Sequence, residues 1–246
     1  MRDQPEQQAP PVQRLRVRYA KRGRLRFTSH RDFSRAFERA LVRAGVPMAY
    51  SSGFHPHPRI SYAGASPTGA ASEAEYLEIG LAREMDPEEV RRMVDESLPP
   101  GLDVLEVVTG HGGSLPDRME ASRWRITLPD VPVDDASAAV AVFLAAGEVT
   151  VERMTKRGLR SFDCREAVAR LEVAGDASAQ VGCAILDTVL RHATPSVRPD
   201  DVLAGLREVH GLHTGSGALL ERLAQGPLDA ETGTVGDPLA PDRDAV

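Results

Sequence analysis

The stretch from Arg14 to Pro67 has the sequence RLRVRYAKRGRLRFTSHRDFSRAFERALVRAGVPMAYSSGFHPHPRISYAGASP, and it holds the clearest structural pattern in the chain. Residues 14–60 contain 12 Lys and Arg against only two acids, Asp32 and Glu38, whereas the whole chain of 246 residues has a formal net charge of −6. Clustered arginines gain free energy when they displace counterions from phosphates, so this asymmetry indicates a polyanionic partner. A solvated basic face, or an internal match with the acidic remainder of the chain, is the alternative.

A half-buried strand is expected at residues 14–20, because apolar and basic residues alternate there with period two. The apolar members are Leu15, Val17 and Tyr19, and the basic members are Arg14, Arg16 and Arg18. After a turn at Lys21–Gly23, Leu25 and Phe27 continue the alternation with Arg24 and Arg26. The pattern therefore predicts a row of guanidinium groups along two consecutive strand segments.

Residues 29–44 are expected to form a helix. Ser29 with Asp32 three positions later resembles a capping box, and apolar residues recur at helical spacing up to Gly45. The polar face carries arginines four residues apart: Arg31, Arg35, Arg39 and Arg43. Like charges at this spacing repel one another unless an anion lies along them, so the face favours binding over simple exposure.

A short strand at Val46–Tyr50 leads into the loop SSGFHPHP, residues 51–58. Its two prolines fix their own φ and hold His55 and His57 in extended conformation, which makes the loop stiff. The loop therefore presents Phe54 and two imidazoles beside the basic helix.

The predicted order through residue 108 is strand, helix, strand, strand, helix, strand. This order is that of the ferredoxin-like split β-α-β unit, in which helices cover one face of an antiparallel sheet. Residues 122–225 repeat it, with an added hairpin turning at Lys156–Gly158 and strands at 168–173 and 181–189. We therefore predict an α+β protein of two ferredoxin-like units, 14–108 and 122–225, joined by a Gly-rich linker at 109–121. The polar ends, residues 1–13 and 226–246, are expected to be disordered tails.

Four motifs point to a family: Ser29–Asp32, Arg35–Ala40, Gly53–Ser61 and Ser72–Ile79. Together they resemble a bacterial radical-SAM-associated family of unknown function, whose members occur alone or as the C-terminal part of radical SAM proteins. Two positions depart from the family pattern, with Arg31 in place of the usual Leu and Glu78 in place of the usual Asp. The resemblance implies a radical SAM protein as partner.

The chain itself lacks the three-cysteine signature of a radical SAM enzyme. Its two cysteines, Cys164 and Cys183, are too few for a disulfide framework or a closed zinc site. His55 and His57 with Glu73 or Glu75 offer a metal-binding alternative, but the flanking prolines explain this loop without a metal. We therefore expect no metal or cofactor, and radical chemistry would belong to the partner.

The predicted function is an accessory protein that binds RNA, such as tRNA or rRNA, and presents it to a separate radical SAM enzyme. On this reading the protein has no activity of its own. The residues expected to contact RNA are Arg16, Arg18, Arg24, Arg26, Arg35, Arg39, Phe54, His55, His57 and Arg59.

Two alternatives remain. His55 or His57 could act as general base or acid in a metal-independent endoribonuclease, since an imidazole titrates near neutral pH. A non-catalytic docking domain for the radical SAM protein would not need the arginines.

His30, near the capping box, is assigned a structural role. No apolar leader or long apolar run is present, so we expect a cytoplasmic protein without membrane association.

Overall fold

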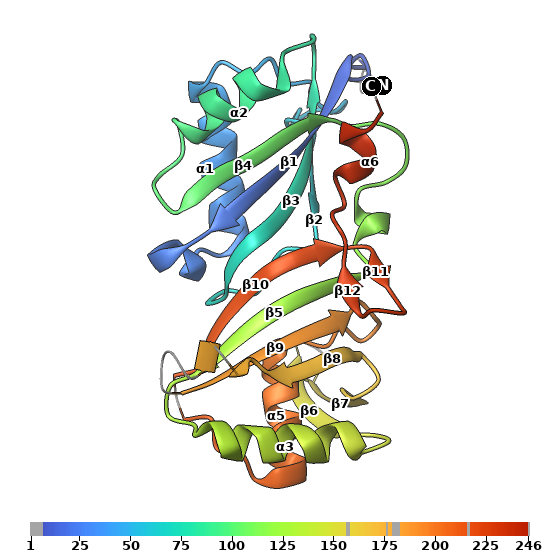
Figure 1. Cartoon of the computed structure of the whole chain (residues 1–246). Helices are drawn as coiled ribbons and strands as arrows, with labels where there is room; N and C mark the ends of the chain where they lie inside the picture. Colours follow the sequence, from blue (N-terminus) through green and yellow to red (C-terminus); the bar gives the residue numbers. More distant parts are fainter. Residues whose placement is uncertain (1–6, 156–157, 176, 179–182, 216, 246) are drawn as a thin grey trace. The chain divides into compact units, whose positions relative to one another are not determined.

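The computed structural model describes residues 7–155, 158–175, 177–178, 183–215 and 217–245. The chain is a mixed α+β protein, and it divides into two compact units (Figure 1). Unit 1 consists of Met1–Met119 together with Pro238–Val246, and unit 2 consists of Glu120–Asp237. Unit 1 is thus built from two segments that lie far apart in the sequence.

Unit 1 contains four strands that pair in the order β4-β1-β3-β2, each pair antiparallel. The strands are β1 (Gln13–Lys21), β2 (Ile60–Ala63), β3 (Ala71–Leu81) and β4 (Leu102–Thr109). The helices are α1 (His30–Arg43), α2 (Pro87–Asp95) and the short α6 (Ala240–Arg243), with 3₁₀ turns η1 (Gly23–Phe27) and η2 (Pro116–Arg118).

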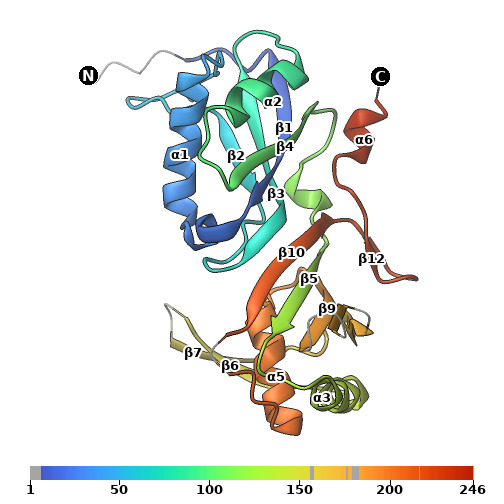
Figure 2. The same cartoon turned by 60° about the vertical axis from the view of Figure 1, so that its left-hand side comes forward.

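The helices α1 and α2 lie against the same face of this sheet (Figure 2). The alternation in β1 turns its apolar side chains toward them, and the Tyr19 ring stacks on Phe33 of α1 with centroids 4.3 Å apart. Ser29 caps α1 as predicted, since its side chain accepts a hydrogen bond from the Asp32 N–H at 3.2 Å. The ring stacking, the Ser29 cap and the buried apolar side chains of α1 together determine which face of this helix is exposed to solvent.

The opposite face of the unit 1 sheet is covered by segments that the sequence suggested were a linker and a disordered tail. Leu115, Met119 and Leu239 form a buried cluster with Ala74 and Tyr76 of β3. Figure 2 shows α6 on the side of β1 and β4 away from α1 and α2. The expectation of disorder at 226–246 is thus corrected, because Leu239 is fully buried and the segment carries secondary structure.

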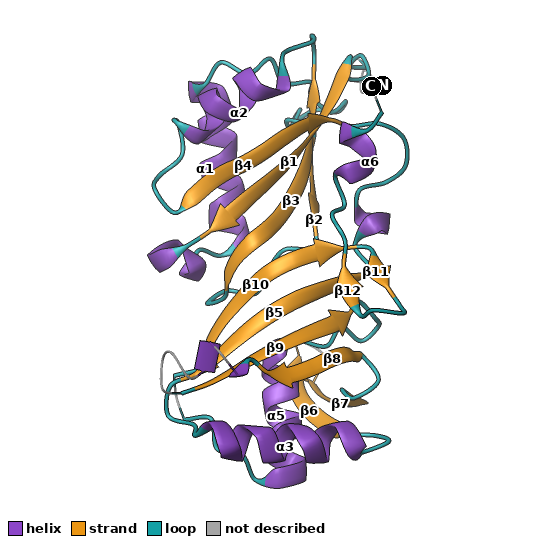
Figure 3. Ribbon diagram, viewed as in Figure 1, coloured by secondary structure: helices purple, strands orange, loops and turns teal. Residues whose placement is uncertain are grey.

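Unit 2 has four strands in the order β10-β5-β9-β8, again with antiparallel pairs (Figure 3). They are β5 (Ala121–Leu128), β8 (Val168–Val173), β9 (Ala184–Arg191) and β10 (Leu219–Gly226). Two helices of unit 2 have described bounds, α3 (Val133–Ala145) and α5 (Pro199–His210), and they pack against each other. Two further strand pairs stand apart from the four strands: β6 (Thr150–Thr155) with β7 (Gly158–Asp163), and β11 (Leu228–Asp229) with β12 (Thr234–Val235).

Two predicted strands of unit 1 have other conformations. Gly23, with φ at 53°, turns the chain away from β1, and the following residues form η1 through local hydrogen bonds instead of a strand. Residues 46–50 make only isolated bridges, Met48 with Leu81 and Tyr50 with Pro58. Pro47 and Pro58 have no N–H to donate to a ladder, which limits the pairing there.

In unit 2 the hairpin and the helix beginning at Pro199 are found where they were predicted. Lys156 and Arg157 of the predicted turn, and Val181 at the start of a predicted strand, lie outside the described residues. No helix in the described part of the chain is long and apolar enough to cross a membrane.

Candidate nucleic-acid interface

Arg16, in the centre of β1, is neutralised within unit 1. Arg16 is only 2% exposed, and its Nη1 donates to both carboxylate oxygens of Asp242 at 2.8 and 2.9 Å. Its Nε donates to Glu78 at 3.1 Å, and Nη2 donates to the carbonyls of Gly112 and Gly113. Arg16 therefore cannot contact RNA in this conformation, which corrects its place among the predicted binding residues.

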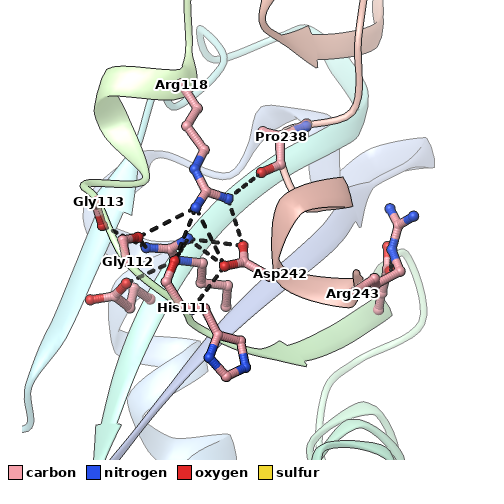
Figure 4. Close-up of polar contacts among 10 residues, drawn as sticks. His111, Gly112, Gly113, Arg118, Pro238, Asp242 and Arg243 are labelled. Carbon is pink, nitrogen blue, oxygen red and sulfur yellow. Dashed lines mark hydrogen bonds and ion pairs between the residues drawn. The ribbon is translucent and has the colours of Figure 1, made fainter. Parts of the chain in front are cut away.

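Asp242 of α6 receives several hydrogen bonds at once (Figure 4). Arg118 Nη1 donates to it at 2.7 Å, and the backbone N–H of His111 donates at 2.8 Å. Burial acts to raise the pKa of Asp242, but the hydrogen bonds from Arg16, His111 and Arg118 outweigh it and hold the pKa below its usual value. We call the set of Arg16, Arg118 and Asp242 the C-terminal clasp.

The next arginines along the chain differ in their accessibility. Arg18 is half-buried and donates from Nε to the Glu73 carbonyl at 2.9 Å. Arg22 forms ion pairs with Glu73 and Asp103. Arg24 is exposed on η1, and the half-buried Arg26 guanidinium lies 4.8 Å from the centroid of the Phe27 ring. Two predicted binding residues, Arg24 and Arg26, thus remain on the surface of η1.

The arginine row of α1 is exposed along its length. Among the described residues, no ion pair is found for Arg31, Arg35 or Arg39, and Arg43 donates only a long hydrogen bond to the Ser97 carbonyl at 3.3 Å. The basic stretch of the sequence therefore separates into two parts. Arg16 and Arg22 are matched by acids of unit 1, whereas the α1 arginines face solvent.

A shallow groove of about 700 Å³ borders this row. It is lined by Arg35, Glu38, Arg39, Val42, Arg43, Tyr50 and Pro58, so it joins α1 to the proline-stiffened loop. Val42 is 72% exposed and Tyr50 is 40% exposed. The groove thus combines guanidinium groups with apolar and aromatic surface, a composition that suits unpaired nucleotides.

The loop at residues 51–58 is held by its backbone and leaves its side chains outside. The Ser51 N–H donates to the His57 carbonyl at 2.8 Å, and the His57 N–H donates to Ser51 Oγ at 3.0 Å. Phe54 is 69% exposed, and His55 is exposed as well. Arg59 is half-buried and donates from Nε to the Tyr50 carbonyl at 3.0 Å, which fixes the end of the loop beside the groove.

The metal-binding alternative gains no support from geometry. Glu73 pairs with Arg22, and Glu75 accepts a hydrogen bond from the Ser66 N–H at 3.0 Å. Within the described ranges, no group of three or more His, Cys, Asp and Glu is placed to hold a metal ion. His30 packs its ring edge-on to Tyr62, with centroids 4.7 Å apart, and so contributes to local packing.

Comparison with protein families identifies one match. The family model described as "Uncharacterized protein conserved in bacteria (DUF2344)" matches residues 14–199. The chain belongs to this family. The match spans the whole candidate interface, from β1 through α1, the loop and β3. No curated protein matches the chain.

The sequence pattern placed Arg35, Arg39, Arg43 and the loop at the binding face, but it did not identify Val42 and Tyr50 as groove residues. Val42 could have been identified from the sequence, because a valine that lies between arginines on the polar face of a helix is expected to be exposed, and exposed apolar residues can mark a binding surface. Tyr50 gave no such signal, because its position in a predicted strand was consistent with burial.

Proposed function

We propose that this protein is an accessory RNA-binding protein that presents RNA to a separate radical SAM enzyme. The observation that supports this most directly is the row of Arg35 and Arg39, exposed and without ion pairs in the described structure, along a groove with apolar and aromatic walls. Phosphates would lie along the guanidinium groups of α1, and Tyr50 and Phe54 would stack with bases. Arg24, Arg26 and Arg59 would extend the basic surface at its two ends.

Two observations support a separate radical SAM partner: the motif resemblance, and the number and burial of the cysteines in this chain. Both cysteines are buried, and burial is the main reason that the pKa of Cys164 is raised to about 12. A thiol of this kind is a poor cluster ligand, because ligation needs the thiolate. Radical chemistry would therefore be supplied by the partner, with this chain contributing substrate binding.

We also propose that each of the two units has a ferredoxin-like fold. The antiparallel order β4-β1-β3-β2 in unit 1 and β10-β5-β9-β8 in unit 2 support two ferredoxin-like units. In unit 2 the β6–β7 hairpin would be an insertion between α3 and β8. Fold resemblance of this kind carries no chemistry by itself.

Fluorescence anisotropy with a labelled single-stranded RNA across a salt series tests RNA binding. We expect the double variant Arg35→Glu/Arg39→Glu to bind at least tenfold more weakly than the wild type and with a shallower salt dependence. Arg83→Glu/Arg92→Glu is the matched control, because it changes the net charge equally at exposed arginines outside the groove. Equal weakening by both variants would show a general charge effect, and no binding by the wild type at low salt would end the RNA proposal.

A metal-independent endoribonuclease is the second candidate, favoured by the exposed imidazoles of His55 and His57 beside the groove. Recovering and sizing the RNA after incubation in the presence of a chelator distinguishes the two functions. A nuclease shortens the RNA, and His55→Ala/His57→Ala abolishes that cleavage while binding persists. If the RNA stays intact with the wild type, the binding role stands without catalysis. A protein that captures a radical SAM partner but no RNA would instead be a docking domain.

A further inference from the structure

A second depression of unit 1 lies on β1, β2 and β3, apart from the α1 groove. Two adjoining hollows of about 300 and 180 Å³ share Arg14, Ser61 and Glu78 as lining residues and so form one trough. The remaining lining residues are Pro11, Arg59, Ile60 and Gly80 at one end, and Gly113, Ser114, Leu115 and Pro116 at the other. Together the hollows fall within the range of small-molecule sites, which is about 300–1,000 Å³.

The carboxylate of Glu78, which lines this trough, is held in place by the buried Arg16. Arg16, itself locked by Asp242, donates from Nε to Glu78 Oε2 at 3.1 Å. The other oxygen, Oε1, lies 3.7 Å from Arg14 Nη1, beyond hydrogen-bond distance. Glu78 thus presents a preorganised acceptor, and within the described residues no hydrogen bond to Oε1 is found.

Arg14, Arg59 and the Ser61 hydroxyl line the same trough as that carboxylate. The Arg14 side chain is 61% exposed, and its contact with Glu78 is loose. Arg59 uses Nε for the Tyr50 carbonyl, which leaves its terminal nitrogens available. The Ser61 hydroxyl supplies a further donor and acceptor on the exposed side of β2.

The wall of the trough is closely packed around Gly80. A Cβ there would lie 3.0 Å from Pro11 Cβ and 3.3 Å from Arg59 Cβ. Residue 80 therefore allows the N-terminal segment and Arg59 to approach each other across β3, which brings a guanidinium to the same hollow as Glu78.

We propose that this trough binds a ribonucleoside 5′-phosphate. Glu78 Oε1 would accept hydrogen bonds from the vicinal ribose hydroxyls, as carboxylates do in dinucleotide sites, and Arg14 and Arg59 would hold the phosphate. A bare anion is disfavoured by Glu78, and a bare cation is disfavoured by the two arginines. A ligand with neighbouring hydroxyl donors and one phosphate satisfies both. A free mononucleotide and the 3′-terminal nucleotide of an RNA offer this same chemistry.

Isothermal titration of the 246-residue chain with AMP, dAMP and adenosine tests the site. We expect AMP to bind at least fivefold more tightly than either dAMP, which lacks the 2′-hydroxyl, or adenosine, which lacks the phosphate. Glu78→Gln should abolish the preference for AMP over dAMP, and Arg14→Ala should weaken AMP at least fivefold without affecting folding. Arg92→Glu is the control and should change neither value. Equal binding of AMP and dAMP by the wild type would overturn the proposal.

A second experiment distinguishes a free mononucleotide from the 3′-terminal nucleotide of an RNA. It uses the Arg35→Glu/Arg39→Glu variant, so that RNA binding by the α1 groove does not contribute. A short RNA ending in a free 2′,3′-diol is compared with the same RNA ending in a 3′-phosphate. Preference for the diol end, lost in Glu78→Gln, identifies an RNA terminus as the ligand, whereas AMP binding without this preference identifies a free nucleotide. If neither AMP nor the diol end binds, the trough is not a nucleotide site, whatever the outcome for the groove.

Discussion

A buried guanidinium needs its partners, and Arg16 shows how completely unit 1 supplies them. Removing an ion from water costs several kcal/mol unless paired charges and hydrogen bonds replace the lost hydration. Asp242 bonds to Arg16 through both of its carboxylate oxygens, at 2.8 and 2.9 Å, across 226 residues of sequence. A carboxylate near the end of this chain therefore joins Glu78 of β3 in pairing with a buried charge in the centre of β1.

Asp242→Ala should destabilise the protein by about 3 kcal/mol, because it removes the carboxylate that accepts two hydrogen bonds from the buried Arg16 and leaves Glu78 as the remaining ion pair. Chemical denaturation monitored by circular dichroism measures the change. Asp244→Ala is the matched control, since Asp244 is exposed at the end of the same helix, and it should alter stability by less than about 0.5 kcal/mol. Equal effects of the two variants would show that the clasp contributes nothing specific.

Gly205 of α5 offers a steric test in unit 2. A Cβ at this position would lie 2.8 Å from Phe143 Cε2, 2.9 Å from Cys164 Sγ and 3.1 Å from Val149 Cγ1. Alanine favours a helix by about 1 kcal/mol over glycine, but overpacking costs about 1–3 kcal/mol, and the rigid neighbours place the cost at the upper end. We therefore expect Gly205→Ala to lower the thermal midpoint. Gly147→Ala, at an exposed site with nothing within 4 Å of the new Cβ, should leave the midpoint unchanged or raise it slightly.

At the residue scale the sequence predicted side-chain faces better than side-chain partners. The alternation in β1 correctly placed Leu15, Val17 and Tyr19 in the core. The same alternation placed Arg16 on the other face, which was correct, but it gave no information about Asp242 covering that face. Period-two patterns report which side of a sheet a residue occupies, whereas the covering segment depends on long-range packing.

Elements with complete local signals were predicted accurately. The cap at Ser29 and the apolar stripe fixed α1, and Asp86 followed by Pro87 fixed the start of α2. The segment at Gly23–Phe27 failed because a strand needs a neighbour, and the left-handed Gly23 directs the chain away from one. Only the α1 side of the groove could be predicted from the sequence. The side formed by Tyr50 could not, because residues 46–50 were predicted as a strand and do not form one.

The short α6 should detach in acid. The pKa of Asp242 is lowered in the folded protein, so its stabilising contribution is complete above the unfolded carboxyl pKa of about 4 and is lost as the pH falls through the folded value. Hydrogen exchange at the Arg243 and Asp244 amides, which bond to Leu239 and Ala240, reports this opening. We expect protection, after correction for intrinsic rates, to fall below pH 4 in the wild type.

The variant Asp242→Asn provides the reference for that experiment. Because asparagine does not titrate, its weaker protection should be independent of pH over the same range. A parallel loss of protection in the wild type and the variant would assign the acid effect to other carboxylates, such as Asp187, whose pKa is also lowered despite its burial because Arg123 and Arg170 bond to it.

At the scale of the whole molecule the charges are unevenly distributed between the units. Unit 1 contains 18 Lys and Arg and 18 Asp and Glu, so the formal net charge of −6 belongs to unit 2. The basic surface of α1 therefore does not come from an excess of cations in unit 1. It arises because Glu73, Glu78, Asp103 and Asp242 pair with arginines elsewhere in the unit. The sequence showed the basic stretch, but only the fold shows which half of it is neutralised.

The return of the chain to unit 1 gives the last prediction. Pro238–Val246 adds Leu239 to the apolar cluster with Leu115 and Met119, and it adds Asp242 to the clasp. Ending the chain after Asp237 should therefore destabilise unit 1 by more than Asp242→Ala alone, since losing a buried leucine costs a further amount of about 2–5 kcal/mol. Ending it after Arg243 keeps both side chains and should be close to neutral in urea denaturation. If the two truncations are equally stable, the cluster and the clasp do not hold the fold together, and the C-terminal segment is only a passive cover of the sheet.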